Sequence, residues 1–321
     1  MKPERRQRSA EKPAVGITIG DPAGIGPEVA LKAALDPRVR SKCRPVLVGP
    51  ESIWKKAGRR LGLDIGSLDI EPTAEPRKMP VPGKISAATG TVSAEAVVAA
   101  AVLCLTGRLA AMATAPISKK ALNLAGYRFP GHTELLAGLA GADKFAMMFV
   151  SETHKVTLAT IHEPIAKLPS LINARMVLDK VWLTERALRR WWGLKRPRIA
   201  VLGLNPHAGE AGLLGSEEGK AVGPAVRSAA RMGIKALGPV SSEAGFRLSA
   251  EGKADALVAM YHDQGLLPLK ALGGSVNLTL GLPFVRTSPD HGTAPDIAGR
   301  GLADPEPMVQ AVLLAARLAG R

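Results

Sequence analysis

The chain has 321 residues, of which 43 are Lys or Arg and 28 are Asp or Glu, giving a formal net charge of +15. Hydrophobic residues make up 46% of the chain and charged residues 22%, a balance that excludes an intrinsically disordered protein. The only cysteines, Cys43 and Cys104, form no CxxC pair, which excludes a disulfide scaffold and a cysteine-rich zinc site and favours a reducing compartment. At roughly 100–200 residues per domain, we expect two domains.

The alternation of short apolar runs with helical patterns predicts an α/β protein. A Pro- and Gly-rich stretch at 72–83 predicts a loop. In chain order we expect a strand at 14–19, a helix at 27–35, a strand at 44–48, a helix at 89–105, a strand at 109–113, a helix at 133–140, strands at 145–150 and 155–161, a helix at 170–191, a strand at 198–202, a helix at 217–232, a strand at 256–260 and a helix at 307–318.

The basic N-terminus, residues 1–14, lacks the apolar core of a signal peptide, and we expect it to be a disordered tail. The sequence contains no run of about eighteen uninterrupted apolar residues, as a transmembrane helix would need. We therefore expect a cytoplasmic protein without a membrane partner. Apart from the tail and residues 186–198 the positive charges are scattered, and aromatics are only 3% of the chain. We therefore favour anionic small molecules over nucleic acid as partners. A non-catalytic anion- or nucleic-acid-binding protein is the remote alternative.

A glycine-rich segment, GDPAGIGPE at 20–28, follows the first expected strand and opens a helix. Glycine permits close approach of the backbone, and a helix N-terminus offers free N–H groups to an anion. The segment is not a Rossmann fingerprint, because Val29 stands at the third glycine position, and no GxxxxGK[ST] motif occurs in the chain. A ligand loop and a tight turn between strand and helix fit the segment equally well.

A second loop, DHGTAPDIAG at 290–299, resembles the adenosine-binding loop of the isopropylmalate and isocitrate dehydrogenases, which bind a nicotinamide cofactor without a Rossmann fold. A carboxylate suits a free ribose diol and repels a 2′-phosphate, so we expect NAD rather than NADP. The alternative is a Gly/Pro-rich turn before a helix. The resemblance implies that His291 stacks near the adenine and that Gly292, Thr293 and Ala294 line the adenine pocket. The carboxylate of Asp296 would accept hydrogen bonds from the ribose hydroxyls.

Three of the six histidines, His162, His207 and His262, lie just past expected strands, and we expect each to open a loop. Strand ends can converge at the functional edge of an α/β sheet. Three imidazoles and a water suit a divalent metal such as zinc. Because their long spacings match no local metal signature, ordinary loop histidines are the alternative.

Six segments, taken together, resemble the 4-hydroxythreonine-4-phosphate dehydrogenase family from Gly16 to the end of the chain: GITIGDPAGIGPE, TAPISKKAL with PGHTE, GLNPHAGE, AMYHDQG and VNLTLGLPFVRTSPDHGTA. The resemblance implies an isocitrate/isopropylmalate dehydrogenase-like fold, with two α/β/α domains and a cleft between them. We expect residues 15–132 with 282–321 to form the first domain. Residues 133–281 would form the second domain, which would carry the dimer contact and the metal site.

The same resemblance implies roles for individual residues. His162, His207 and His262 would hold one divalent ion per subunit (zinc, magnesium or cobalt), at an active site on the interface of a homodimer. Lys270 and Arg286 can hold phosphate or carboxylate by charge-assisted hydrogen bonds. The general base stays open between Lys270, Asp263 and a metal-bound water, and His132 is expected to orient the substrate. The implied substrate contacts are His132, Thr133, Lys270, Asn277 and Arg286.

The implied reaction is the NAD- and metal-dependent oxidation of 4-phosphooxy-L-threonine to the 3-oxo acid. That acid would decarboxylate to 3-amino-2-oxopropyl phosphate, in pyridoxine 5′-phosphate biosynthesis. Two departures leave the substrate open: Ser241, Ser242, Glu243 and Ala244 stand where the family often has Pro-Ala-Asp-Thr, and the loop between Lys270 and Asn277 is short. A 4-phosphothreonate or 4-phosphoerythronate dehydrogenase is the alternative.

Overall fold

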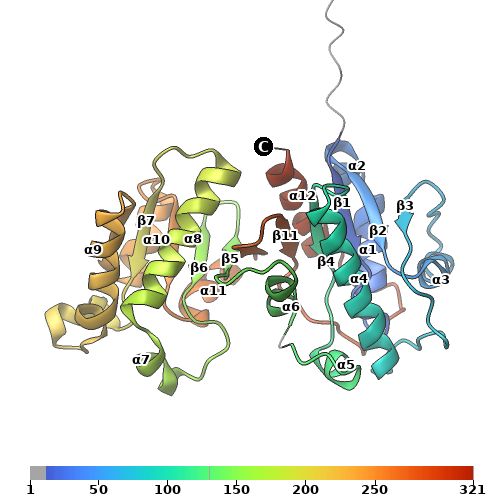
Figure 1. The fold of residues 1–321 in the computed structure, drawn as a ribbon, viewed down its shortest axis with the longest axis horizontal. Coiled ribbons are helices and arrows are strands. Elements are labelled where there is room, and N and C mark those ends of the chain that lie inside the picture. The colour runs from blue at the N-terminus through green and yellow to red at the C-terminus, as the bar shows by residue number, and fades with distance from the viewer. Residues whose placement is uncertain (1–11, 130, 321) are drawn as a thin grey trace, which may run out of the picture.

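A computed structural model describes residues 12–129 and 131–320. One eleven-stranded sheet, in the order β3-β2-β1-β4-β11-β10-β5-β6-β9-β7-β8, runs through the molecule with helices packed around it (Figure 1). The expected α/β class is confirmed. Strands β5 and β11 lie in the middle of the view, between a half with β1 to β4 and a half with β6 to β9.

The strands are short, as expected for buried runs bounded by turns. Strand β10 is antiparallel to both β11 and β5, and β5 is antiparallel to β6, whereas the other neighbours are parallel. Their bounds are β1 Ala14–Thr18, β2 Arg44–Val48, β3 Asp69–Glu71, β4 Ala111–Thr114, β5 Ala146–Val150, β6 Lys155–Leu158, β7 Arg198–Leu202, β8 Lys235–Val240, β9 Ala256–Ala259, β10 Val276–Leu280 and β11 Val285–Ser288.

The helices follow the strands along most of the chain. Besides the α-helices, Ile165–Lys167 (η1) forms a short 3-10 helix, and Glu218–Val222 (η3) is a π-helical turn that leads into α9. Pro206–Gly212 (η2) is a turn whose central residues do not have right-handed helical backbone angles. The α-helices are α1 Gly26–Leu35, α2 Pro37–Lys42, α3 Glu51–Leu61, α4 Ala87–Leu105, α5 Lys119–Leu124, α6 His132–Leu139, α7 Leu168–Leu171, α8 Ala174–Trp192, α9 Gly223–Arg231, α10 Ser242–Ala250, α11 His262–Ala271 and α12 Glu306–Ala319.

Most of the expected elements are present, and β2 and β7 have the expected bounds. The start of the helix expected at 170–191 is wrong, because the helical conformation ends with α7 at Leu171 and resumes with α8 at Ala174. There the side chain of Asn173 accepts a hydrogen bond from the backbone N–H of Met176 (3.0 Å) and caps the new helix. The helix expected at 217–232 is divided into the π-helical turn and α9.

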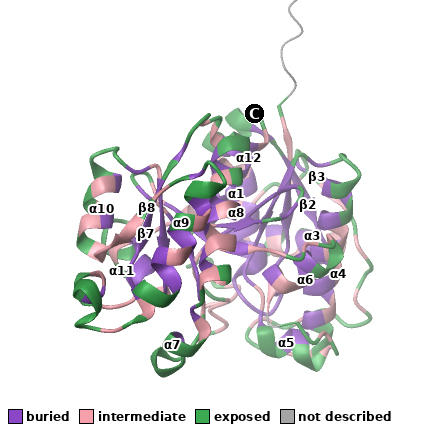
Figure 2. Cartoon of the chain, turned by 60° about the vertical axis from the view of Figure 1, so that its left-hand side comes forward, coloured by how far each residue is buried: buried purple, intermediate pink, exposed green. Residues whose placement is uncertain are grey.

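Helix α4 is long and apolar enough to cross a membrane, but 61% of its most apolar window is buried inside the fold. It begins with a capping box in which Ser86 and Thr89 exchange hydrogen bonds between side chain and backbone. Its contacts with α5, α6 and β1 make it a core helix. Figure 2 shows such buried positions gathered around the strands and on the faces of the helices turned toward them.

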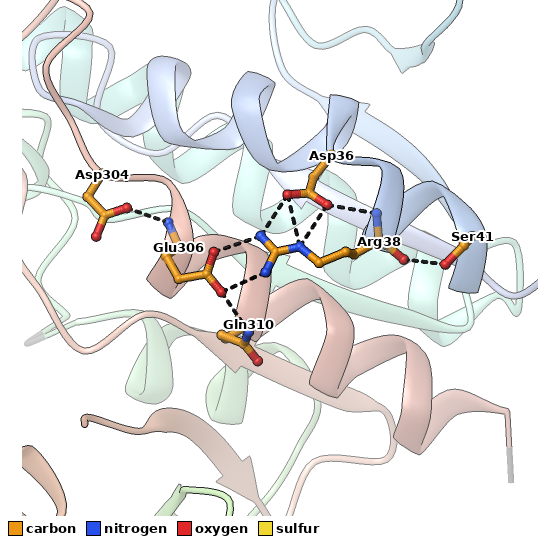
Figure 3. A network of polar contacts seen from close by, with 6 residues as sticks. All are labelled: Asp36, Arg38, Ser41, Asp304, Glu306 and Gln310. Carbon is orange, nitrogen blue, oxygen red and sulfur yellow. Dashed lines mark hydrogen bonds and ion pairs between the residues drawn. The ribbon is translucent and has the colours of Figure 1, made fainter. Parts of the chain in front are cut away.

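Helix α12 returns to the half of the molecule where the chain began. Arg38, at the start of α2, donates to Asp36 (2.8 Å) and to Glu306 at the start of α12 (2.7 Å), as Figure 3 shows. The N–H of Glu306 donates to Asp304 (2.9 Å), which fixes this end of the helix. The network therefore joins two helices that are far apart in the sequence.

Residues 1–11 of the expected N-terminal tail lie outside the described part of the chain. Lys12 donates to the carbonyl of Arg40 (2.7 Å), and Ala14, the last residue assigned to the tail, is the first residue of β1. The division into domains at 132/133 and 281/282 stays a prediction.

Candidate active site

A cavity of about 680 Å³ lies where β4, β6, β9 and β11 end and β10 begins. Strands β4 and β11 run antiparallel to β6 and β9, so the two sets of carboxyl ends reach the cavity from opposite directions, and side chains of the central strands β5 and β10 line it between them. Many of the expected site residues line this cavity although they come from distant parts of the chain: His132, Thr133, His162, His262, Lys270, Asn277, Arg286 and His291. The other expected residues do not line it: His207, Asp263, Gly292, Thr293, Ala294 and Asp296.

Arg286, on β11, is 2% exposed although it carries a guanidinium group. Its Nε and Nη2 donate to Thr114 Oγ1 (3.1 and 2.6 Å), and its Nη1 donates to Thr279 Oγ1 (3.0 Å). Within the described chain no carboxylate forms an ion pair with it. Burial lowers the pKa of Arg286 to about 9, because the charged form has lost its hydration. Such a site gains stability from an anion that enters the cavity.

His132 is the first residue of α6 and lies close to Arg286 in the cavity. Burial, and then the charge of Arg286, hold the pKa of His132 well below its usual range, so its imidazole is neutral near neutral pH. Its Nε2, Thr133 Oγ1 and Asn277 Oδ1 are buried and have no hydrogen-bond partner among the described residues. Buried polar atoms of this kind normally have a partner, so a bound ligand is the natural one.

His162 follows β6, and His262 follows β9 and opens helix α11 rather than the expected loop. Their ring centroids are 5.6 Å apart, with 39° between the ring planes. Burial, followed by the positive charge of Lys119, lowers the pKa of His162 and favours the neutral form that binds metals. His262 Nδ1 lies 2.7 Å from Asp263 Oδ1, an arrangement that leaves Nε2 of His262 to face a ligand.

His207 lies apart from these two histidines, on the turn η2. Residues 207–211 all have left-handed backbone angles, with φ between 43° and 78°, and this conformation costs of order 1–3 kcal/mol for each non-glycine residue. The buried carboxylate of Glu218 supports the turn, because it accepts hydrogen bonds from Asn205 N (2.7 Å) and Nδ2 (3.0 Å). Among the described residues, no group of three or more His, Cys, Asp or Glu side chains could hold a metal.

The two expected candidates for the base lie in different surroundings. Lys270, on α11, is part of the cavity wall. The side chain of Asp263 is 77% exposed, and its Oδ1 lies 2.7 Å from His262 Nδ1. The position of Asp263 therefore suits orientation of the imidazole better than removal of a proton from a substrate.

The loop expected to hold the cofactor is packed against the glycine-rich segment. Ile25 N donates to Thr293 O (2.9 Å), and a Cβ added to Gly24 would lie 2.5 Å from the same oxygen. Ala294 has a φ of 37°, and only His291 of this loop's expected residues lines the cavity of about 680 Å³. The glycine-rich segment is thus a tight turn whose close approach sets the position of the second loop.

Several polar residues of the cavity had no role assigned from the sequence: Thr114, Lys119, Glu134 and Ser288. All four stand inside segments that carry the family resemblance: TAPISKKAL, PGHTE and VNLTLGLPFVRTSPDHGTA. Pattern alone did not distinguish them from neighbours that face the core. Glu243, one of the four residues that depart from the family pattern, lies on α10 and does not line the cavity.

Known proteins with similar sequences and structures show the family to which the chain belongs. Residues 41–315 match the family model described as pyridoxal phosphate biosynthetic protein PdxA. The 4-hydroxythreonine-4-phosphate dehydrogenase of Geobacter metallireducens is 45% identical, with 96% of each chain covered, and that of Trichlorobacter lovleyi is 42% identical, with 96% of this chain and 98% of the relative covered.

Among solved structures, the 4-hydroxythreonine-4-phosphate dehydrogenase of Klebsiella pneumoniae superposes with a TM-score of 0.90 at 39% identity. The match covers 98% of this chain and all of that one. The agreement extends over the full fold and not over one motif alone. The chain therefore belongs to the PdxA family, and it is an oxidoreductase.

Proposed function

We propose that this protein oxidises 4-phosphooxy-L-threonine at its secondary alcohol with NAD, in pyridoxine 5′-phosphate biosynthesis. The 3-oxo acid formed would lose carbon dioxide to give 3-amino-2-oxopropyl phosphate. The observation that carries the proposal is the buried guanidinium of Arg286, which faces the cavity without a carboxylate partner among the described residues. A phosphate group on the substrate would supply the missing negative charge.

The polar atoms beside Arg286 suit the rest of such a substrate. The orphaned atoms of His132, Thr133 and Asn277 would bond to its phosphate, hydroxyl and amino groups. Because the imidazole of His132 is neutral, it can donate from one ring nitrogen without adding a second buried charge. We assign to Lys270, on the wall of the cavity, the removal of the hydroxyl proton by its Nζ.

The residues present fit a divalent metal, zinc, magnesium or cobalt, and NAD. His162 and His262 offer two neighbouring imidazoles, and Asp263 orients the second of them. His291 has a buried Nε2 with no hydrogen-bond partner among the described residues, and it precedes the loop of Gly292, Thr293, Ala294 and Asp296 that would hold the adenosine. The chemistry that the two groups supply when bound is Lewis acidity at the alcohol oxygen and acceptance of the hydride.

We propose that the active protein is a homodimer, in which His207 of the partner subunit completes the metal ligands. Two observations support a shared site. His207 is exposed on a costly turn away from the other two histidines. Large apolar side chains near the turn and on and just after α11 are strongly exposed: Leu213 (82%), Leu267 (68%) and Leu272 (65%). A second copy of the chain would bury them.

The test of the function is the rate of NADH formation by the purified, metal-loaded protein. We expect kcat/KM for 4-phosphooxy-L-threonine to exceed that for 4-phosphothreonate and 4-phosphoerythronate, which lack the amine. A preference for either of the amine-free acids would move the protein to the alternative function. No NADH from any of the three would contradict the proposal as a whole. The cytoplasmic location stays a prediction.

A further inference from the structure

A second cavity, of about 890 Å³, lies at the other end of β10 and β11 from the candidate active site. Its walls are the C-terminal half of α8, the turn of residues 140–144 that leads into β5, and the β10–β11 turn of residues 281–283. Cavities of roughly 300–1,000 Å³ are typical of sites for small molecules. The proposed reaction uses none of these residues.

The charges on the wall of this cavity are unbalanced. Four cations, Lys144, Arg186, Arg189 and Arg190, share it with two carboxylates, Asp143 and Glu185. Lys144 is neutralised by Asp179 (2.8 Å), and Arg189 is neutralised by Glu185 (3.2 Å). The other two arginines have no ion pair among the described residues.

Arg186 and Arg190 are one helical turn apart on α8, so their side chains leave the same face of the helix. Two like charges at this spacing weaken a helix rather than stabilise it. Both guanidinium groups are nevertheless held in place. Arg186 lies over the ring of Trp182 (4.7 Å), and Arg190 lies near that of Trp191 (5.9 Å) and donates to the carbonyl of Pro283 (2.7 Å). Both residues are exposed, and guanidinium groups that leave the same face of a helix can together donate to the oxygens of a phosphate.

The β10–β11 turn connects this cavity to the first one. A Cβ on Gly281 would lie 2.1 Å from the carbonyl oxygen of Lys144, so the turn fits closely against the neighbouring wall. The two strands that leave the turn carry Asn277 and Arg286, which line the candidate active site. A ligand that draws Arg190 away from Pro283 would therefore act on the strands that position both side chains.

We propose that the second cavity binds a phosphorylated small molecule through Arg186 and Arg190, and that the β10–β11 hairpin transmits its occupancy to the active site. The binding step is independent of the reaction proposed above, whereas the transmission step rests on it. Binding at either site then changes the affinity of the other by the same factor.

Calorimetry of the full-length protein with inorganic pyrophosphate tests the binding step. We expect the double variant Arg186→Gln, Arg190→Gln to lose about tenfold or more in affinity, since two charge-assisted contacts are removed. Arg175→Gln, on the same helix but outside the cavity, is the matched control and should bind like the wild type. Lys270→Gln, in the first cavity, should keep this binding.

Three results would overturn the binding step: no pyrophosphate binding by the wild type, equal affinity in the double variant, or an equal loss in Arg175→Gln, which would mark unspecific charge screening. Steady-state kinetics test the transmission step. Pyrophosphate should change kcat/KM of the wild type more than that of the double variant, and equal changes would refute transmission. Calorimetry stays valid even if the proposed substrate is not turned over, so the two failures are distinguishable.

Discussion

Arg286 links one residue's environment to the chemistry of the whole cavity. Its side chain is buried, is held by two threonine hydroxyls and forms no ion pair among the described residues, although the charge of Glu134 acts on it from the same cavity. Isolated buried charges are expensive in the absence of a partner. The arrangement is therefore best explained by a ligand that is negatively charged whenever the site is filled.

Replacement of this arginine should weaken substrate binding more than it weakens the fold. We expect Arg286→Gln to lower kcat/KM roughly 10- to 150-fold, equivalent to about 1.5–3 kcal/mol, mainly through KM, because the charge is lost while the contacts to threonine can persist. Arg108→Gln, which removes an exposed ion pair with Glu71, is the control for the loss of one arginine charge. An unchanged KM in a folded Arg286→Gln protein would show that the phosphate binds elsewhere.

Gly24 allows a second prediction for a single residue. A methyl group here would come within 2.5 Å of Thr293 O and would displace the loop expected to hold the cofactor. We expect Gly24→Ala to raise the Kd of NADH about tenfold, measured by NADH fluorescence, as typical of a loop displaced from a productive geometry. In the control variant Gly219→Ala the new Cβ meets no atom within 4 Å. Equal affinity in the two variants would separate the glycine-rich turn from cofactor binding.

Sequence reasoning could identify many site residues, but not the strand order that brings them to one cavity. His162, Asn277 and Arg286 were named from motifs, and they converge because β6, β10 and β11 run near one another in a sheet whose strand order no local pattern contains. Lys119 and Glu134 were missed since nothing in their spacing separates a residue that faces the cavity from one that faces solvent. The left-handed turn at His207 had no sign in the sequence either, since four of its five residues are not glycine.

Among the helices and strands, those with a clear local pattern of apolar residues could be predicted from the sequence. Strands β2 and β7 are apolar runs with clear ends, and both were located correctly. Helix α11 was missed because Gly265 and Pro268 interrupt its pattern, and its neighbours in the fold stabilise it instead. Strands β10 and β11 were not predicted, because they stand close together in the chain and mix polar with apolar residues.

The contact between α2 and α12 should depend on pH. Hydrogen bonds from Arg38 lower the pKa values of Asp36 and Glu306 below their ordinary 3.8 and 4.5. Carboxyl groups with lowered pKa values stabilise the fold above those ordinary values, and the contribution is lost as the pH falls below them. We therefore expect Arg38→Gln to lower the Tm slightly near neutral pH, and the difference to vanish in acid.

Thermal unfolding followed by circular dichroism over a pH series measures this difference. Lys55→Gln, which removes an exposed pair with Glu51 inside α3, is the control for a charge change that joins no distant helices. A Tm difference for Arg38→Gln that stays constant down to acid pH would contradict the role of the two carboxyl groups.

At the scale of the whole molecule, a site shared between subunits can be tested by mixing inactive chains. In a hybrid dimer of His162→Ala and His207→Ala subunits, one site would keep all three histidines. We expect such hybrids, isolated through two different tags, to regain about half of the wild-type activity and metal content. Hybrids of His162→Ala with His262→Ala should stay inactive, because both residues would come from the same subunit. Inactive hybrids of the first kind would place each site within one chain.

The order of the strands also bears on how the protein is made. Strand β4 pairs on one side with β1, but its other neighbour is β11, which begins only at Val285. During synthesis the edge of β4 that will pair with β11 therefore stays unpaired, and α12 does not yet pack on β4. We expect a chain stopped after Ala271 to aggregate, which light scattering would detect, and a soluble, monomeric fragment would contradict this. A late segment of the chain thus protects an early one, and a nascent chain that stalls between them is the species for which a chaperone would be needed.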